Sequence, residues 1–375
     1  MIESYPSLVF FINGEFINAG NRPTQAVINP ATEEVLGQLP LATQADLDDA
    51  LAAAAAAFKT WKHSSPMERS AILRKAAESA RARAPQIGRN LTLDQGKPLS
   101  QAIAEIVSCA DHCDWHAEEC RRIYGRIIPP RRANFRQYVI QEPIGVCAAF
   151  TPWNFPFNQA IRKISAAIGA GCTIILKGPE DSPSAIMAIA ELFRDAGLPK
   201  GVLNIVWGDP PFVSDYLIRS PIVRKISFTG SVPVGKQLAA LAGAHMKPVT
   251  MELGGHSPVL ILDDADIAKT ARSLARSKIR NAGQTCVSPT RIYVQQKAYD
   301  QFLSEFTSQL SNIHIGNGLD EAVEMGPLAH ERRLAAMGGL IADARQQGAT
   351  IELGGERLQR EGFFYAPTVL TNTHH

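Results

Sequence analysis

The alternation of short apolar runs with amphipathic helix patterns between about residues 145 and 254 is the feature that most constrains the fold. Runs such as TIILK and VTMEL have no polar alternation, which is typical of parallel strands covered on both faces. The helix patterns between the runs, such as NQAIRKISAAIGAG and PSAIMAIAELFRDAG, predict a doubly wound α/β sheet. Ligands bind such sheets at the carboxyl ends of the strands, so a site is expected in the loops that follow them.

Helical and extended segments flank this sheet. Residues 44–122 carry apolar positions at helix spacing, with Ala, Leu and charged residues between them. The segment RIIPPRRANFRQYVIQEP then interrupts the helices with two prolines and an alternating run, and it predicts an extended excursion. From about residue 255, the strand patterns SPVLILDD and RIYVQ alternate with helices again. We therefore expect a second α/β domain, as the length of 375 residues also favours.

The composition excludes several classes of function. A formal net charge of +2 gives no reason to expect nucleic acid or an anionic membrane as a partner. No apolar run approaches the length of a membrane span, and the N-terminus has an early acidic residue where a secretory signal has a basic start. Six cysteines are too few for a disulfide scaffold in a chain of this length, which favours a reduced, cytoplasmic setting.

One of the six cysteines has unusual surroundings. Cys286 lies in NAGQTCVSPTR, among small and polar residues, at the end of a helix pattern and before the strand pattern RIYVQ. A cysteine of the core would have apolar neighbours, and burial as an inert thiol is the commonest fate of a free cysteine. The surroundings of Cys286 favour a thiol that is placed to react.

Four loops that follow predicted strands, together with the cysteine loop of the second domain, can converge at one edge of the sheet. They are TPWNFP, LKGPE, FTGSVPVG, MELGG and GQTC. Together and in this order they resemble the aldehyde dehydrogenase superfamily, and within it they are most similar to NAD-dependent succinate-semialdehyde dehydrogenases. The resemblance runs from INGEF near the N-terminus to YAPTVL, and the spacing agrees, since Asn154 and Glu252 precede Cys286 by 132 and 34 positions.

The resemblance implies a fold and a division of the chain. It implies a Rossmann-like NAD-binding domain over residues 1–122 and 143–254, and an extended oligomerisation excursion over residues 123–142. It also implies an α/β catalytic domain over residues 255–375 that is incomplete at its C-terminus. A homo-oligomer, either a dimer or a tetramer, is expected for the full-length chain.

The resemblance also implies the catalytic residues. Cys286 is expected to attack the aldehyde carbon as a thiolate and give a thiohemiacetal. Asn154 and the backbone N–H of Cys286 are expected to donate hydrogen bonds to the developing oxyanion. Glu252 is expected to act as the general base, and its apolar flank VTMEL predicts a partly desolvated carboxylate. The alternatives are an inert buried thiol, a turn asparagine and a solvated glutamate at the end of a strand.

NAD is the expected hydride acceptor. Lys177 and Glu180 match the family positions that bind the adenosine ribose, and the carboxylate favours NAD over NADP because it repels a 2′-phosphate. The glycine-containing turn FTGSVPVG opens a helix whose N-terminus is expected to face the pyrophosphate. The further positions that the resemblance assigns to the cofactor are Trp153, Gly230, Ser231, Gly235 and Leu253.

Two arginines suggest the class of aldehyde. Arg162 and Arg280 match positions at which succinate-semialdehyde dehydrogenases hold the distal carboxylate of the substrate, and paired guanidinium groups suit a carboxylate. An exposed helix arginine is the alternative for each, and a different keto-acid or ω-oxo-acid aldehyde is an alternative substrate. Position 288 is Ser, so the second cysteine that some of these enzymes use as a redox switch is absent.

The segment CADHCDWHAEEC resembles a metal site at first sight. Cys109, His112, Cys113 and His116 share one helix face. The surrounding pattern predicts one continuous amphipathic helix in which small cysteines pack well, so we expect no metal. His256, in MELGGHSP, stands where the family usually has Lys or Asn, and it is expected to tune packing.

The C-terminus departs from the family pattern. Family members continue past YAPTVL with a segment whose glutamate holds the nicotinamide ribose, and with the terminal strand of the oligomerisation sheet. We therefore expect the excursion at 123–142 to lack its partner strand. A catalytically impaired NAD-binding fragment is therefore an alternative to an active enzyme. A dehydrogenase that passes the thioester to coenzyme A is a third alternative, which the presence of Glu252 disfavours.

Overall fold

A seven-stranded sheet forms the centre of the computed structural model, which describes residues 5–373. The order of its strands is β11-β10-β7-β8-β9-β1-β2. Five neighbouring strands are parallel: β7 (Val146–Phe150), β8 (Thr173–Lys177), β9 (Leu203–Val206), β10 (Val223–Gly230) and β11 (Val249–Leu253). The hairpin of β1 (Phe10–Ile12) and β2 (Glu15–Ile17) pairs with β9 in the antiparallel sense and was not predicted from the sequence.

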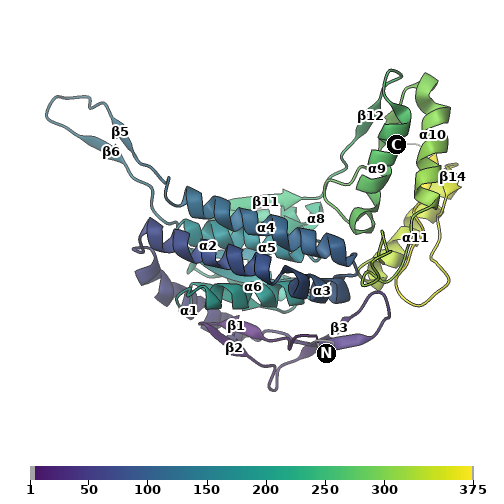
Figure 1. Cartoon of the computed structure of the whole chain (residues 1–375). Helices are drawn as coiled ribbons and strands as arrows, with labels where there is room; N and C mark the ends of the chain where they lie inside the picture. Colours follow the sequence, from purple (N-terminus) through teal and green to yellow (C-terminus); the bar gives the residue numbers. More distant parts are fainter. Residues whose placement is uncertain (1–4, 374–375) are drawn as a thin grey trace.

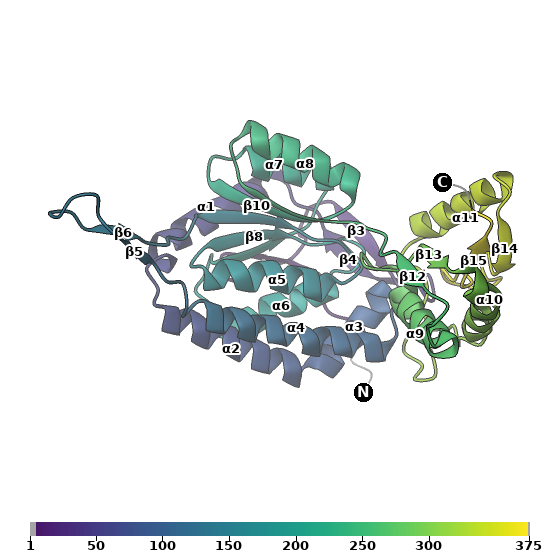
Figure 2. The same cartoon turned by 90° about the horizontal axis from the view of Figure 1, so that it is seen from above.

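Helices cover both faces of this sheet, as Figure 2 shows. One face carries α1 (Gln44–Trp61), α7 (Pro210–Arg219) and α8 (Val232–Ala244). The other carries α5 (Pro156–Gly169) and α6 (Ser184–Asp195). A second helical layer lies outside these two and consists of α2 (Pro66–Ala82), α3 (Ala84–Gln95) and α4 (Leu99–Glu119). The predicted doubly wound α/β fold is confirmed, since helices lie on both sides of parallel strands.

Burial of the strands follows their place in the sheet. The runs VCAAF and TIILK are buried along their whole length because β7 and β8 are central strands with helices on both faces. The prediction that VTMEL is covered on both faces is wrong, since β11 is the edge strand and α8 is the helix that packs against it. Val249 of β11 is 38% exposed.

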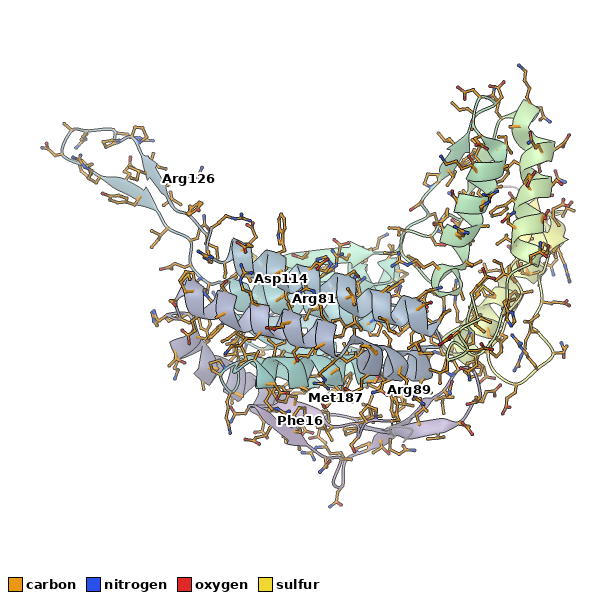
Figure 3. All side chains as sticks on the ribbon, in the orientation of Figure 1. Phe16, Arg81, Arg89, Asp114, Arg126 and Met187 are labelled. Atoms are coloured by element: carbon orange, nitrogen blue, oxygen red, sulfur yellow. The ribbon has the colours of Figure 1, made fainter. Side chains whose placement is uncertain are left out.

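Local signals in the sequence explain how the outer helices begin and how they hold together. The Ser65 hydroxyl accepts a hydrogen bond from the backbone N–H of Glu68 at 3.1 Å, and Pro66 follows it at the first helical position of α2. Arg81 of α2 pairs with Asp111 and Asp114 of α4 at 2.7 and 2.5 Å (Figure 3). These ion pairs bridge α2 and α4, two antiparallel helices of the outer layer.

The excursion is a hairpin that projects from the body, as Figure 1 shows. It consists of β5 (Arg126–Ile128) and β6 (Gln137–Val139), and it pairs with no other strand among residues 5–373. Arg126, labelled in Figure 3, lies on this arm. The extended conformation expected for this segment is therefore present.

The residues after 258 form a second lobe around separate hydrophobic clusters. It contains a parallel pair of strands, an antiparallel pair and three helices: β12 (Val259–Ile261), α9 (Ile267–Ile279), β13 (Ile292–Val294), α10 (Gln296–Ser311), α11 (Glu331–Gln346), β14 (Thr350–Leu353) and β15 (Val369–Thr371). The predicted domain boundaries stay predictions.

A hairpin of the N-terminal segment reaches this second lobe. It consists of β3 (Thr24–Ile28) and β4 (Val35–Pro40). In the turn between them, the Pro30 carbonyl accepts from the N–H of Phe363 at 2.9 Å, and the Glu33 carboxylate accepts from the N–H of Gly362 at 3.0 Å. The start and the end of the described chain are thus joined. Among residues 5–373, no helix combines the length and the apolar character needed to cross a bilayer.

Candidate active site

The loop that carries Cys286 begins at a sharp kink. Helix α9 ends at Ile279, and Asn281 and Ala282 both adopt the left-handed conformation, with φ of 51° and 52°. A glycine adopts this conformation without strain, whereas the Cβ of Ala282 makes it unfavourable. The backbone is therefore strained at this position. Cys286 is exposed beyond the kink, whereas the other five cysteines are buried.

Asn154 is joined directly to this loop. Its side-chain Nδ2 donates to the backbone carbonyl of Gln284 at 3.0 Å, two residues before the thiol. The Asn154 Oδ1 accepts from the N–H of Phe155 at 3.0 Å, which fixes the orientation of the amide. An amide nitrogen has two N–H groups, so the bond to Gln284 leaves one N–H of Asn154 for another acceptor beside Cys286.

The backbone carbonyl of Asn154 is held as well. It accepts from Lys97 Nζ at 2.8 Å and from Asn281 Nδ2 at 2.9 Å. Lys97 is buried and forms an ion pair with Glu105 at 2.5 Å. The sequence analysis missed Lys97, Glu105 and Asn281, although DQGKP, with a lysine directly after a helix-ending glycine, was a visible signal.

Glu252 lies at the carboxyl end of β11, where the sequence placed it, but its side chain is exposed. The expected desolvation of this carboxylate is therefore wrong, because the edge strand β11 leaves it open to solvent. The loop after β11 approaches the thiol, since a Cβ added at Gly255 would lie 3.6 Å from the carbonyl oxygen of Cys286. Burial lowers the pKa of Lys163 to about 8, and the nearby Glu252 carboxylate opposes that shift.

The end of β8 carries the predicted cofactor pair. Lys177 Nζ contacts Glu180 Oε2 at 2.6 Å, and both side chains are largely buried. Glu180 Oε1 accepts from the N–H of Gly208 at 3.1 Å, directly after β9. A Cβ added at Gly178 would lie 2.2 Å from the Trp207 ring, so the turn after β8 needs a glycine.

The turn after β10 places a free helix N-terminus at the same edge of the sheet. Ser231 is the N-cap of α8, and its side chain accepts no capping hydrogen bond, so it satisfies none of the first backbone N–H groups of α8. A Cβ added at Gly235 would lie 2.5 Å from Leu253, and one added at Gly230 would lie 2.4 Å from the Phe228 ring. Gly235 lets α8 approach β11 closely, and an uncapped N-terminus suits a phosphate group.

Trp153 joins this edge to the second lobe. Its ring meets the His330 ring edge to face, with centroids 5.0 Å apart, and its carbonyl accepts from the Ser182 hydroxyl at 3.0 Å. His330 is the N-cap of α11, and burial lowers its pKa while Asp181 opposes the shift. Asp181 also pairs with Arg332 of α11 at 3.1 Å. No motif in the sequence indicated His330, which contacts the site through tertiary packing alone.

The two predicted substrate arginines come from different elements: Arg162 lies in the second turn of α5, and Arg280 directly follows α9. Arg162 Nε donates to the Asn158 side chain at 2.7 Å. The Arg280 guanidinium lies 5.1 Å from the centroid of the Phe155 ring, and Phe155 is the residue before α5. Both side chains are exposed. The structure therefore brings two cations to the residues that directly follow Asn154.

The remaining candidates have local contacts. His256 Nδ1 lies 2.7 Å from the Thr290 hydroxyl, so this histidine joins the end of β11 to the cysteine loop. The helix α4 is continuous through CADHCDWHAEEC, and Cys109 and Cys113 are buried in it. His116 Nδ1 lies 2.8 Å from the Ser165 hydroxyl of α5. No group of three metal-ligating side chains comes together in the part of the chain that the structure describes.

Comparisons with known proteins agree with this arrangement. The Aldehyde dehydrogenase family model matches residues 16–375. The succinate-semialdehyde dehydrogenase of Escherichia coli, whose name specifies NADP(+), is 42% identical over 361 residues, which are 96% of this chain and 75% of that protein. The glutarate-semialdehyde dehydrogenase of Pseudomonas putida is 42% identical over 362 residues, with the same shares of the two chains.

A solved structure supports the fold independently. The NAD+ complex of an aldehyde dehydrogenase from Bacillus cereus superposes with a TM-score of 0.95 at 33% identity, over 98% of this chain and 76% of that one. The matched family model covers nearly the whole sequence, and the matched structure covers nearly the whole fold. The chain belongs to the aldehyde dehydrogenase family, whose members oxidise aldehydes with a nicotinamide cofactor.

Proposed function

We propose that this chain oxidises a carboxylate-bearing semialdehyde, such as succinate semialdehyde, to the corresponding acid with NAD. The observation that carries the proposal is the hydrogen bond from Asn154 to the carbonyl of Gln284, because it holds an amide donor beside the one exposed thiol, Cys286. Family membership supports the same class of reaction.

The chemistry begins with the thiol. The thiolate of Cys286 attacks the aldehyde carbon, and the carbonyl oxygen becomes an oxyanion that accepts from the free N–H of Asn154 and from the backbone N–H of Cys286. Bound NAD supplies the hydride acceptor. Loss of hydride leaves a thioester on Cys286, and Glu252 takes a proton from the water that hydrolyses it. The balance is one aldehyde, one NAD+ and one water in, and one acid, one NADH and one proton out.

The residues at the sheet edge fit a dinucleotide. The uncapped N-terminus of α8 after Ser231 suits the pyrophosphate, and the close approach at Gly235 keeps that helix against Leu253. Glu180 is held by Lys177 and by the N–H of Gly208, so its carboxylate has a fixed position from which to accept the ribose hydroxyls. Further contacts of the cofactor are proposed for Trp153 and Gly230.

NAD is proposed over NADP because of Glu180. A fixed carboxylate accepts hydrogen bonds from a 2′-hydroxyl and repels a 2′-phosphate. The name of the E. coli relative specifies NADP(+), whereas the Bacillus cereus structure is an NAD+ complex, so relatives of both kinds exist. A Glu180→Ser variant tests the choice, since it is expected to raise kcat/KM with NADP relative to NAD.

The class of substrate is proposed from charge. Arg162 contacts Asn158 in the first turn of α5, and Arg280 lies over Phe155, the residue before that helix, whose N-terminal dipole also favours an anion. Both semialdehydes in the names of the two relatives, succinate and glutarate, carry a distal carboxylate. A four-carbon or five-carbon aldehyde acid is therefore the proposed substrate.

The exposed surface of the excursion at residues 123–142 favours a homo-oligomer. Large side chains of the segment are strongly exposed, including Tyr124, Ile127, Tyr138 and Ile140, with exposed fractions of 65–78%. An apolar surface of this kind marks an interaction site in a soluble protein. We propose that two copies of the chain cover it, and sedimentation of the chain beside an Ile127→Lys/Ile140→Lys variant tests this. The reduced, cytoplasmic setting stays a prediction.

A second candidate function is nicotinamide binding without turnover. The exposure of Glu252 on the open strand β11 favours it, because a solvated carboxylate is a weaker general base at neutral pH.

NADH formation from succinate semialdehyde at 340 nm, with and without coenzyme A, tests the proposal. A Cys286→Ser variant is the control, and it is expected to bind NAD and to lack turnover. NAD binding without turnover in the unmodified chain would support the second candidate, and an acyl-CoA product would support acyl transfer.

A further inference from the structure

A buried ion pair contacts the segment of the proposed site that carries Asn154. The side chains of Lys97 and Glu105 are 0% and 1% exposed, and Lys97 Nζ lies 2.5 Å from Glu105 Oε2. Lys97 precedes α4 and Glu105 lies within it, so both belong to the outer helical layer. Neither residue lies on a strand of the sheet or in a loop that follows one.

The pair contacts the segment of Asn154 at two points. Lys97 Nζ donates to the Asn154 carbonyl at 2.8 Å and lies 4.0 Å from the centroid of the Phe155 ring. Glu105 uses its second oxygen, Oε1, to accept from the backbone N–H of Asn158 at 3.0 Å. Both charged side chains therefore hydrogen-bond to the backbone that runs from Asn154 into the first turn of α5.

The same outer segment also holds the cysteine loop. Gln95 Nε2 donates to the Asn281 side chain at 2.9 Å, and the backbone N–H of Asn281 donates to the Gln101 side chain at 2.9 Å. Asn281 Nδ2 in turn donates to the Asn154 carbonyl at 2.9 Å. The left-handed backbone at Asn281 costs free energy, and it persists because these contacts determine it.

The Lys97–Glu105 ion pair is better explained by the geometry that it imposes than by the stability that it adds. A buried ion pair gains little over apolar residues of similar volume, because the desolvation of two charges offsets their attraction. The Lys97–Glu105 pair therefore contributes little net stability beyond what a well-packed apolar pair would give. An apolar pair would, however, offer no donor to the Asn154 carbonyl and no acceptor to the Asn158 N–H.

We propose that Lys97 and Glu105 are positioning residues that set the Asn154 amide against the loop of Cys286. The inference rests on the proposed function, because the position matters through the oxyanion that Asn154 stabilises. Misplacement of such a donor by about 1 Å lowers turnover by up to about 100-fold.

The variant that tests this removes both charges at once. Lys97→Met/Glu105→Met keeps the volume approximately and leaves no unpaired charge, so the chain is expected to fold with a similar Tm. We expect kcat to fall about 10- to 100-fold while KM for the aldehyde and Kd for NAD stay unchanged. Arg83→Met/Glu191→Met is the control, because that ion pair lies in the helical layers on the same side of the sheet but contacts neither loop. It is expected to leave kcat unchanged.

A double-mutant cycle with Asn154→Ala shows whether the pair acts through Asn154. In the Asn154→Ala background, Lys97→Met/Glu105→Met is expected to cause no further loss of kcat. An equal further loss in that background would overturn the inference. A wild-type kcat in Asn154→Ala alone would instead contradict the proposed role of Asn154, so the two failures are distinguishable.

A readout that does not need turnover completes the test. Amide hydrogen exchange of the free chain is expected to speed up over residues 152–158 and 281–286 in the doubly neutral variant, and to stay unchanged in α10. Unchanged exchange over both segments would show that the ion pair does not hold them, and it would overturn the inference even if no aldehyde is oxidised.

Discussion

The side-chain amide of Asn154 donates to the backbone carbonyl of Gln284 at 3.0 Å, and this bond joins a loop of the central sheet to a loop of the second lobe. The two residues are 130 positions apart in the chain. The bond therefore ties the donor proposed for the oxyanion to the segment that carries the proposed nucleophile. Any change that breaks it is expected to affect chemistry more than binding.

Replacement of Asn154 by Ala tests that expectation. Removal of one oxyanion donor lowers kcat by about 10²- to 10³-fold, and we expect a loss in this range with little change in Kd for NAD. Steady-state kinetics and NAD titration measure the two quantities. Asn312→Ala, at the exposed end of α10, is the control and should leave both unchanged. A larger change in NAD affinity than in kcat would argue against the oxyanion role.

Labelling of thiols tests the placement of Cys286. A chromogenic aromatic disulfide should react quickly with one thiol per native chain, because Cys286 is exposed and the other five cysteines are buried. Burial also raises the pKa of Cys113 to about 12, which keeps that thiol protonated at neutral pH. Denaturant should release the remaining five thiols, and Cys286→Ser should remove the fast phase. A fast phase of two or more thiols would contradict the described burial.

Much of the architecture was predictable, because it depends on local pattern. The order of strands and helices from β7 to β11 follows from apolar runs that need cover and from helices that present one apolar face. The place of a strand within the sheet does not follow from its own residues. VTMEL is as apolar as TIILK, yet β11 is an edge strand and β8 a central one, and so the exposure of Glu252 was mispredicted.

The support of the site was predictable only in part. Asn154 follows β7 and Lys177 ends β8, and a shared sheet edge brings the ends of such strands together. Cys286 follows helix α9 of the second lobe, and its reactive surroundings were visible in the sequence. Lys97, Glu105 and His330 come from elements outside that edge. Their contacts depend on how the outer helices and the second lobe pack, which no short motif encodes. A buried lysine beside a glutamate eight positions later has the same local sequence whether it lies in a core or on a surface.

The proposed role of the two arginines is tested by comparing an aldehyde that carries a carboxylate with one that does not. Arg280→Ala and Arg162→Ala are each expected to raise KM for succinate semialdehyde by about 10-fold or more, because a charge-assisted hydrogen bond to the carboxylate is lost. Butyraldehyde, which has the same chain length without the carboxylate, should be unaffected. Arg272→Ala, on an exposed face of α9, is the matched control. Equal effects on both aldehydes would assign the two arginines a structural role.

The pH dependence of stability should be governed in part by Asp94, at the end of α3. Burial raises the pKa of this carboxyl group to about 7, although its Oδ2 accepts from the Tyr5 hydroxyl at 2.8 Å and from the N–H of Ser184 at 2.9 Å. Its Oδ1 has no hydrogen-bond partner among the described residues, so the charged form is poorly solvated. The folded chain therefore holds this proton more tightly than the unfolded chain does.

The sign of the effect follows from that difference. Between pH 3.8, the ordinary pKa of the carboxyl group, and about 7, the unfolded chain loses the proton first. The contribution of Asp94 to the free energy of unfolding therefore falls as pH rises and is level above about pH 7. Asp94→Asn mimics the protonated form and should be more stable than wild type by a few kcal/mol at pH 8, with the advantage shrinking towards pH 4. Urea unfolding from pH 4 to 8.5 measures this, with the exposed Asp215→Asn as control. Parallel stability curves for wild type and Asp94→Asn would show that Asp94 titrates alike in both states, and hence that its burial at α3 does not perturb it.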